Sequence, residues 1–424
     1  MTLIKQKQLN TNIGQHTAFF CILIVSTLLG PLVYLEVASL YHFVIMGLGV
    51  LLLCKGFSIE DYDLTIMKFL GIWLLEALFS CFWAPDKPIA LRHVYYIFLI
   101  FGVCLLICTY ITKENLITCF RVLIFILLIC NIIAIWETIS GHHLQKDYLD
   151  SALRLRLLEF MPGTFYRNPN DSATNMIQLL PFSFAGIFDK KSYIRIISII
   201  NLILSFYSVC AAQSRTQVII IIMMFIFFSL LMKKGALLGI LVGAAALLLV
   251  FSLIFPDLGV IVTDAIESIA TDEIQNSAEV GSLHTRTNLF RNGIFMLIDY
   301  FGLGVGAGCH RALMPAYAAE HYYTGGITVM HNLFGEILVD YGIFIAIAFI
   351  ITIIVTCSNL LKIYRKGESM EMKIASLMLF FSTATFILCG VSSSSILQLT
   401  SLWMTFGIVA AIIKINKDNQ KRES

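Results

Sequence analysis

The stretch TVMHNLFGEILVDYG, residues 328–342, places three polar side chains at the start of an apolar run. His331 and Asn332 lie where the predicted helix begins, and Glu336 follows about one turn later. A neutral imidazole near pH 7 can take a proton from a hydroxyl group, so His331 is a candidate general base. The alternative is that His331 only caps the helix or lies at the membrane interface. Glu336, five residues away, is not ideally spaced to orient the imidazole and is a candidate supporting residue.

Arginines form the second group that could do chemistry. Eight of the twelve arginines, but only two of the seventeen lysines, fall on the predicted outer side of a membrane. These arginines are Arg92, Arg154, Arg156, Arg167, Arg215, Arg286, Arg291 and Arg311. A guanidinium matches a phosphate with two hydrogen bonds and an ammonium does not, so the set predicts phosphate binding. Two alternatives are pairing with acids in residues 264–279 and, for Arg215 at a span end, simple extension to the membrane surface.

The elements that must position these residues are apolar helices. Of the 424 residues, 58% are hydrophobic and 13% are charged, against about 25% charged in soluble domains. Apolar runs long enough to cross a bilayer predict an all-α polytopic membrane protein with about twelve transmembrane helices. The runs are 17–35, 37–54, 65–83, 93–111, 116–139, 173–188, 193–212, 216–232, 235–255, 332–357, 374–392 and 395–413. The first is not expected to be a cleaved signal, since no small-x-small site follows it.

The lysine distribution orients the predicted spans. If Lys5 and Lys7 are cytoplasmic, the other lysine-rich loops and the tail from Lys414 fall on the same side. Both termini are then cytoplasmic, and two large loops, 140–172 and 256–331, are extracytoplasmic. Eight of the nine histidines lie at or beyond this outer boundary, and His16 is the exception. We expect one polytopic domain, residues 1–424, with part of the active site in the loop 256–331.

The loop 256–331 is predicted to contain two helices and a glycine-rich turn. Residues 256–275 alternate apolar and acidic faces at helical spacing, which predicts an amphipathic surface helix. Residues 285–302 predict a more apolar helix that ends at Gly302. The turn GLGVGAG, 302–308, formally fits a GxGxxA dinucleotide fingerprint, which we reject because a helix rather than a strand precedes it. We expect its backbone to approach another helix or a ligand, and its amides could hold an anion.

The earlier loop leads into a helix through GTFYRNPNDSATNM, residues 163–176. Asn168, Pro169 and the polar residues after them predict a turn and helix cap. Capping does not explain the three arginines nearby, Arg154, Arg156 and Arg167. No metal or cofactor site is expected: all cysteines except Cys309 fall in predicted spans, there is no CxxC pair, and His142–His143 has no neighbouring carboxylate.

Four motifs together resemble the O-antigen ligase and polysaccharide polymerase superfamily, bacterial membrane glycosyltransferases that use undecaprenyl-diphosphate-linked glycans. They are, in chain order, GTFYRNPNDSA before a span, SRT at the start of a span, TRTNLF…IDYFGLGVGAG, and HNLFGEILVDYG. The resemblance covers nearly the whole length of the chain. The resemblance implies that Arg215, Arg286 and His331 bind the donor diphosphate and activate the acceptor. Phe290 departs from the pattern, since relatives often have tryptophan there.

The resemblance and the residue pattern together predict a polysaccharide polymerase. It would transfer glycan from an undecaprenyl-diphosphate-linked donor to a sugar hydroxyl of a lipid-linked repeat, without metal, on the outer face of the bacterial cytoplasmic membrane. The residues expected to bind diphosphate or glycan are Arg154, Arg156, Arg167, Arg291, Arg311, Asn170, Asn332 and Glu336. A chain-length regulator and a flippase are candidate partners, and nucleic acid is not.

Two rival functions use different features. A ligase that moves the finished glycan to lipid A-core or another surface acceptor fits the same scaffold and chemistry. A flippase or other transporter would be expected to show midplane charges, broken helices and an internal repeat. The sequence shows few midplane charges and no repeat, and no Walker motif lies on the cytoplasmic side to drive transport with nucleotide. The sequence therefore favours transfer over transport.

Overall fold

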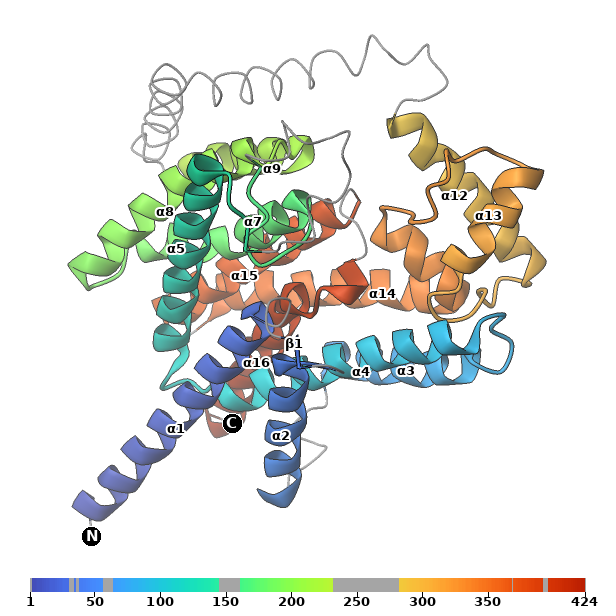
Figure 1. Cartoon of the computed structure of the whole chain (residues 1–424). Coiled ribbons are helices and arrows are strands. Elements are labelled where there is room, and N and C mark those ends of the chain that lie inside the picture. The colour runs from blue at the N-terminus through green and yellow to red at the C-terminus, as the bar shows by residue number, and fades with distance from the viewer. Residues whose placement is uncertain are drawn as a thin grey trace. The chain divides into compact units, whose positions relative to one another are not determined.

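The computed structural model describes residues 2–29, 34–35, 38–55, 64–144, 161–231, 282–367, 369–391 and 396–423 (Figure 1). The helices are α1 (Thr2–Leu29), α2 (Leu40–Lys55), α3 (Thr65–Ser80), α4 (Lys87–Tyr110), α5 (Leu116–Ser140), α7 (Pro169–Gly186), α8 (Ser192–Ala211), α9 (Arg215–Leu231), α12 (Ser282–Asp299), α13 (His310–Glu320), α14 (Leu333–Lys366), α15 (Met370–Gly390), the 3-10 turn η3 (Ile396–Gln398) and α16 (Thr400–Glu423). Two short strands, β1 (Tyr34–Leu35) and β2 (Ala38–Ser39), pair antiparallel, with Tyr34 opposite Ser39.

Five described helices are long and apolar enough to cross a membrane: α4, α5, α8, α14 and α15. Shorter apolar stretches are Ile13–Leu29, Leu40–Cys54 and Thr216–Leu230. Eleven of the predicted spans coincide with a helix, and the remaining run, 235–255, lies outside the described residues. The predicted helical membrane fold is confirmed as a class, and the number of spans stays a prediction.

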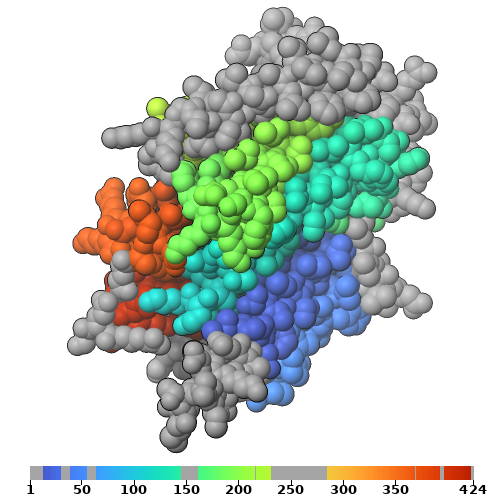
Figure 2. Space-filling view, turned by 90° about the vertical axis from the view of Figure 1, so that its left-hand side faces the viewer, coloured from blue at the N-terminus to red at the C-terminus, as the bar shows by residue number. Residues whose placement is uncertain are grey.

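The chain divides into two compact units, each described by itself. Unit 1 comprises Met1–Tyr41, Lys113–Glu273 and Leu377–Cys389. Within it α5, α7 and α8 pack on one another, α9 packs on α7 and α8, and α1 packs on α5. Figure 2 shows the teal surface of α5 running between the green surface of α8 and the blue surface of α1.

Buried amides and hydroxyls tie the helices of unit 1 together. Asn131 on α5 donates to Ser205 Oγ on α8 over 2.9 Å, and Asn201 donates to the Ile124 carbonyl over 2.9 Å. Asn131 and Asn201 are fully buried. Hydrogen bonds between such groups satisfy polar atoms that would otherwise be costly in an apolar environment.

Unit 2 comprises His42–Thr112, Ile274–Ser376 and Gly390–Ser424. Here α4 packs on α3 and α16, and α14 packs on α3, while α12 and α13 form a hairpin on α14 (Figure 1). Aromatic rings fill the interior: Trp73 lies edge-on to Tyr341 at a centroid distance of 5.4 Å and 5.6 Å from Trp403. All three rings are at most 2% exposed.

Helix boundaries in the loop 256–331 differ from those predicted. α12 begins at Ser282, so Arg286 lies in its second turn rather than its first. The predicted helix at 256–275 lies outside the described residues. The structure adds α13, which was not predicted, and it interrupts α14 at Gly342, where φ is 82° and ψ is 177°. The long helix after the HN motif is therefore two helical segments joined at a glycine.

Candidate functional site

His331 lies immediately before α14 in a backbone conformation that is unusual for a side-chain-bearing residue. Its φ is +51°, in the left-handed region, and its side chain is half-buried. Asn332, not His331, caps the helix: its Oδ1 accepts from the amides of Phe334 at 3.0 Å and Gly335 at 3.1 Å. The capping explanation for His331 is therefore wrong. The side-chain oxygen of Asn332 already accepts two helix amides, and the binding of diphosphate or glycan by Asn332 stays a prediction.

Two arginines act on the His331 imidazole. Burial lowers the pKa of His331 below its usual value, and the positive charges of Arg286 and Arg311 lower it further. Arg286 comes from α12, Arg311 from α13, and His331 from the connection that enters α14. Unit 2 thus brings together three predicted residues that are separated by up to 45 positions in the chain. A neutral imidazole beside two cations can accept a proton while the cations face an anion.

Glu336 lies close to Arg311, one of these two arginines. It lies in the first turn of α14, is only 2% exposed, and its Oε1 is 3.8 Å from Arg311 Nη2. A buried carboxylate at this distance orients a guanidinium through charge. The contact agrees with the supporting role predicted for Glu336, and its contact with glycan stays a prediction.

The glycine-rich turn is bound to α14 through its backbone. The amides of Val305 and Gly306 donate to the carbonyls of Val339 at 2.8 Å and Asp340 at 3.1 Å, and Ile343 N donates to Gly302 O at 3.0 Å. Of the two expectations for this turn, close approach to another helix is confirmed. Most backbone amides of the turn already donate hydrogen bonds to the protein, so few of them remain to hold an anion.

A buried histidine–carboxylate pair connects the start of α13 to α14, and it was not predicted from the sequence. Asp340 Oδ1 accepts from His310 N at 2.9 Å, and Asp340 Oδ2 lies 2.8 Å from His310 Nδ1. Burial alone would lower the pKa of His310, but the Asp340 carboxylate outweighs it and raises that pKa. The pair fixes the start of α13, and with it the adjacent Arg311. Thirty residues separate the partners, so no local pattern indicates the contact.

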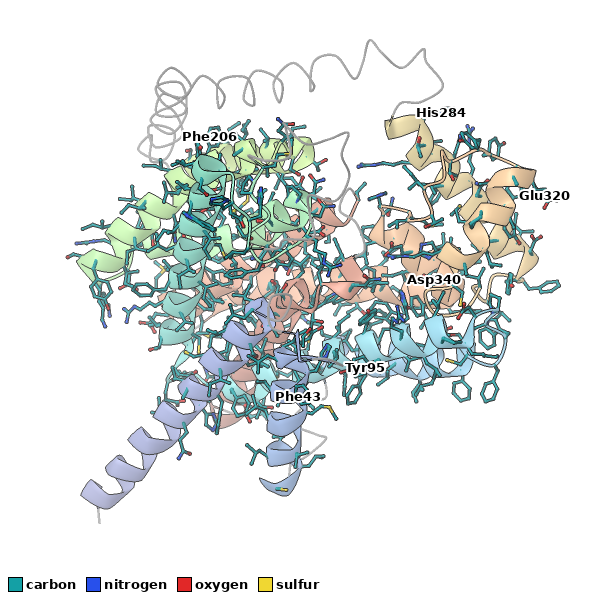
Figure 3. All side chains as sticks on the ribbon, in the orientation of Figure 1. Phe43, Tyr95, Phe206, His284, Glu320 and Asp340 are labelled. Carbon is teal, nitrogen blue, oxygen red and sulfur yellow. The ribbon has the colours of Figure 1, made fainter. Side chains whose placement is uncertain are left out.

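His93 on α4 lies against the glycine-rich turn, in the same unit as Asp340, which Figure 3 labels. A Cβ on Gly308, whose φ is +70°, would lie 2.2 Å from the His93 ring, so only glycine fits there. Trp83 Nε1 donates to the Gly304 carbonyl at 2.9 Å. The glycine-rich turn is therefore held by α14, by α4 and by the connection between α3 and α4.

In unit 1, the two earlier motifs meet through side-chain hydrogen bonds. Ser214 Oγ donates to Asn170 Oδ1 at 2.6 Å and also contacts Gln217 Oε1, and Gln217 Nε2 donates to Thr174 Oγ1 at 2.9 Å. These contacts join the start of α7 to the start of α9, whose first residue is Arg215. The Asn170 side chain therefore bonds to Ser214, the residue immediately before Arg215.

The turn before α7 has the cap that the sequence predicted. Asn168 is the N-cap, its Oδ1 accepts from Asn170 N at 2.9 Å, and Pro169 is the first helical residue. Buried Glu137 holds the preceding loop, since its carboxylate accepts from Thr164 N at 2.7 Å and from Leu144 N at 2.9 Å. These bonds stabilise the segment that carries the exposed Arg167.

The remaining candidates fall into two groups. Arg154 and Arg156 lie outside the described residues. Arg291 is exposed on α12, with its guanidinium 5.1 Å from the centre of the Tyr322 ring. Within the described ranges, no group of three or more His, Cys, Asp or Glu side chains is arranged to hold a metal ion. The chemistry present is arginine, histidine and buried carboxylate.

Comparison with known proteins relates this arrangement to surface-polysaccharide enzymes. Residues 200–350 match the family described as O-Antigen ligase. The chain is also 24% identical over 357 residues to the teichuronic acid biosynthesis protein TuaE of Bacillus subtilis (strain 168), covering 82% of this chain and 72% of that protein. These findings confirm the predicted resemblance to an O-antigen ligase/polymerase-like family. In the part of the chain that the structure describes, five helices are also long and apolar enough to cross a membrane, in keeping with an integral membrane protein.

Proposed function

We propose that this member of the O-antigen ligase/polymerase-like family is a polysaccharide polymerase that uses a polyprenyl-diphosphate-linked donor. The acceptor is a sugar hydroxyl of another lipid-linked repeat, and the reaction takes place on the outer face of the cytoplasmic membrane. The observation that carries the proposal is the juxtaposition of His331 with Arg286 and Arg311 in unit 2. A proton acceptor and cations that stabilise negative charge are the two functions that glycosyl transfer from a diphosphate requires, and these residue types supply both.

The proposed step forms one bond and breaks one bond. The acceptor hydroxyl oxygen attacks the anomeric carbon of the donor, and its proton moves to the unprotonated ring nitrogen of His331. The bond between the anomeric carbon and the phosphate oxygen breaks, and its electron pair leaves with the polyprenyl diphosphate. The proton on His331 then passes to solvent, which the half-buried position of the ring permits. The imidazole is returned to its neutral state for the next transfer.

Arginine performs the electrostatic part of the proposed step. Negative charge on the diphosphate grows as the glycosidic bond breaks, and guanidinium groups stabilise that charge. Arg286 and Arg311 are the candidates beside His331. Arg215 enters the proposal through its family motif, supported by the hydrogen bonds of Ser214 and Asn170 that organise the start of α9. Burial and the charges of Arg286 and Arg311 favour the neutral form of His331, and the same two arginines supply the positive charge of the site.

The proposal is tested by surface polysaccharide length in a deletion strain that carries the wild type or His331→Ala, Arg286→Ala or Arg215→Ala. We expect these variants to reach the membrane at normal levels and to yield only single-repeat material. His142→Ala and Arg195→Ala are matched controls, since both side chains are exposed and lie outside the candidate cluster. Polymer of normal length from the His331 and arginine variants would contradict the proposed glycosyl transfer at these residues.

The second candidate function is a ligase, because the matching family is described as O-Antigen ligase. The same experiment distinguishes a ligase from a polymerase. A ligase defect leaves long glycan chains on the polyprenyl carrier, because chains grow but never reach the final acceptor. A polymerase defect leaves single repeats. Lipid-linked chain length in the His331→Ala strain therefore distinguishes the two.

A further inference from the structure

Aromatic rings gather on the α12–α13 hairpin, beyond the groups used in the proposed reaction. Phe295 stacks on His321 with centroids 4.2 Å apart and planes 13° from parallel, and Tyr317 lies 5.9 Å from His321. Tyr322 lies 6.3 Å from Phe295. We call Phe295, Tyr317, His321 and Tyr322 the aromatic platform. It belongs to unit 2, on the chain between the two segments that supply Arg286 and His331.

The platform is exposed although its rings are large. Phe295 and Tyr322 are each 37% exposed, and the neighbouring Tyr323 is 77% exposed. α12 and α13 are not among the described helices that are long and apolar enough to cross a membrane. A surface cluster of stacked rings is typical of a binding site.

Buried amides hold the backbone beneath these rings. Asn292 donates to Tyr322 O at 2.8 Å and accepts from Tyr322 N at 3.2 Å, and Asn288 donates to Tyr323 O at 2.9 Å. Asn292 is fully buried and Asn288 is 4% exposed. Two buried side chains thus fix the segment whose rings remain in contact with solvent. Such preorganisation reduces the entropy lost on binding a ligand.

Charge and hydrogen-bonding groups border the platform. The Arg291 guanidinium lies 5.1 Å from the centre of the Tyr322 ring, and Tyr317 donates to Asp299 Oδ2 at 2.6 Å. The face of an aromatic ring carries partial negative charge and attracts the weakly positive C–H groups of a sugar ring. The charged and polar edges can bond to sugar hydroxyls, and Arg291 can pair with an acidic substituent. Lipid tails would use none of these polar groups.

We propose that the aromatic platform, with Tyr323 and Arg291, binds the sugar rings of the glycan chain being extended. The inference rests on the proposed function and adds a second site to it, because the platform contacts glycan away from the bond being formed. Asn288, Asn292 and Arg286 are on one helix, so the platform and the arginine beside His331 share a rigid support. Holding the chain between successive additions would favour long products.

The test uses the full-length protein in lipid nanodiscs and the host strain's own surface polysaccharide, cleaved to oligosaccharides. Binding is measured by saturation-transfer NMR or calorimetry, and polymer length is measured in the deletion strain. We expect Tyr322→Ala to weaken oligosaccharide binding about ten-fold and to shorten the polymer while linkages still form. Tyr322→Phe keeps the ring and should retain both properties.

Tyr193→Ala is the matched control. Tyr193 lies at the start of α8, is 49% exposed, and has Lys191 Nζ 5.6 Å from its ring centre, so it is an exposed tyrosine beside a cation like Tyr322. It should bind and polymerise as the wild type does. Unchanged binding and length in Tyr322→Ala would overturn the glycan platform. Loss of affinity for anionic lipid vesicles instead of oligosaccharide would also overturn it, in favour of a lipid contact.

The experiment separates failure of the platform from failure of the polymerase. His331→Ala should abolish linkage formation and leave oligosaccharide binding at the platform unchanged. If His331→Ala makes normal polymer while Tyr322→Ala loses oligosaccharide binding, the reaction is wrong and the platform stands. If His331→Ala is inactive while Tyr322→Ala resembles the wild type, the reaction stands and the platform is wrong.

Discussion

His310 and Asp340 are joined twice, through the His310 backbone amide at 2.9 Å and the imidazole Nδ1 at 2.8 Å. Both side chains are fully buried. One carboxylate thus fixes both the first residue of α13 and its ring against α14. Since Arg311 is the next residue, the pair determines where the guanidinium beside His331 and Glu336 can lie.

Removing the Asp340 carboxylate should therefore destabilise the contact between α13 and α14. We expect Asp340→Ala to lower the free energy of unfolding by about 3–5 kcal/mol, because a buried histidine loses its charged partner. Asp340→Asn keeps an acceptor for the His310 amide and should cost less. Thermal unfolding of the purified protein in detergent measures both. Equal melting temperatures for Asp340→Ala and the wild type would show that the pair does not stabilise the fold.

Gly304 tests the contact between the glycine-rich turn and α14. A Cβ at Gly304 would lie 2.6 Å from both Asp340 O and Gly342 N, and its φ is +86°. Gly304→Ala should cost at least about 3 kcal/mol, the sum of overpacking and left-handed strain, and should reduce activity. Gly325→Ala is the control, because φ there is +62° and nothing lies within 4 Å. It should cost only about 1–2 kcal/mol. Equal losses of stability would mean that backbone strain alone, and not the close approach, explains the glycine.

Alanine substitution of Asn170 should mainly reduce activity, whereas alanine substitution of Asn168 should mainly reduce stability. Asn170→Ala removes the acceptor for Ser214 next to Arg215 and should reduce turnover by up to about 100-fold through misplacement, with a small change in stability. Asn168→Ala removes the α7 cap, which should cost about 1 kcal/mol of stability and little activity. Lipid-linked turnover and thermal unfolding measure the two properties. A matching loss of activity in both variants would assign Asn170 a structural role only.

The spans could be predicted from the sequence because an apolar run about as long as a bilayer is thick most often forms a transmembrane helix. Sequence reasoning grouped His331, Arg286 and Arg311 through their residue types. Within unit 2 the charges of both arginines act on the His331 imidazole, and their shared role in a site stays a prediction. Sequence reasoning missed α13, an 11-residue helix that contains Pro315 and follows glycines, both of which normally mark a break. The interruption at Gly342 was hidden because glycine is tolerated inside an apolar run. The His310–Asp340 pair depends on how distant segments pack, and no spacing in the chain indicates it.

The acidic limb of the pH–rate profile should depend on Arg311. A base works only when unprotonated, so activity falls as pH decreases through the pKa of His331. That pKa is lowered first by burial and then by Arg286 and Arg311, so the limb of the wild type should lie below about 6.5, the usual histidine value. Arg311→Gln removes one positive charge, which raises the pKa and moves the limb to higher pH. The movement is partial because burial and Arg286 remain.

Single-turnover rates of Arg311→Gln and Arg311→Lys, measured from pH 5 to 8 with a lipid-linked donor, test this dependence. Arg311→Lys retains the charge and should keep the wild-type limb. Arg291→Gln is the control, because Arg291 is another arginine of the hairpin and does not act on the pKa of His331. It should change product length and leave the limb in place. A limb at the same pH in Arg311→Gln and the wild type would show that His331 is not the group that titrates, and the proton acceptor would then have to be sought elsewhere in unit 2.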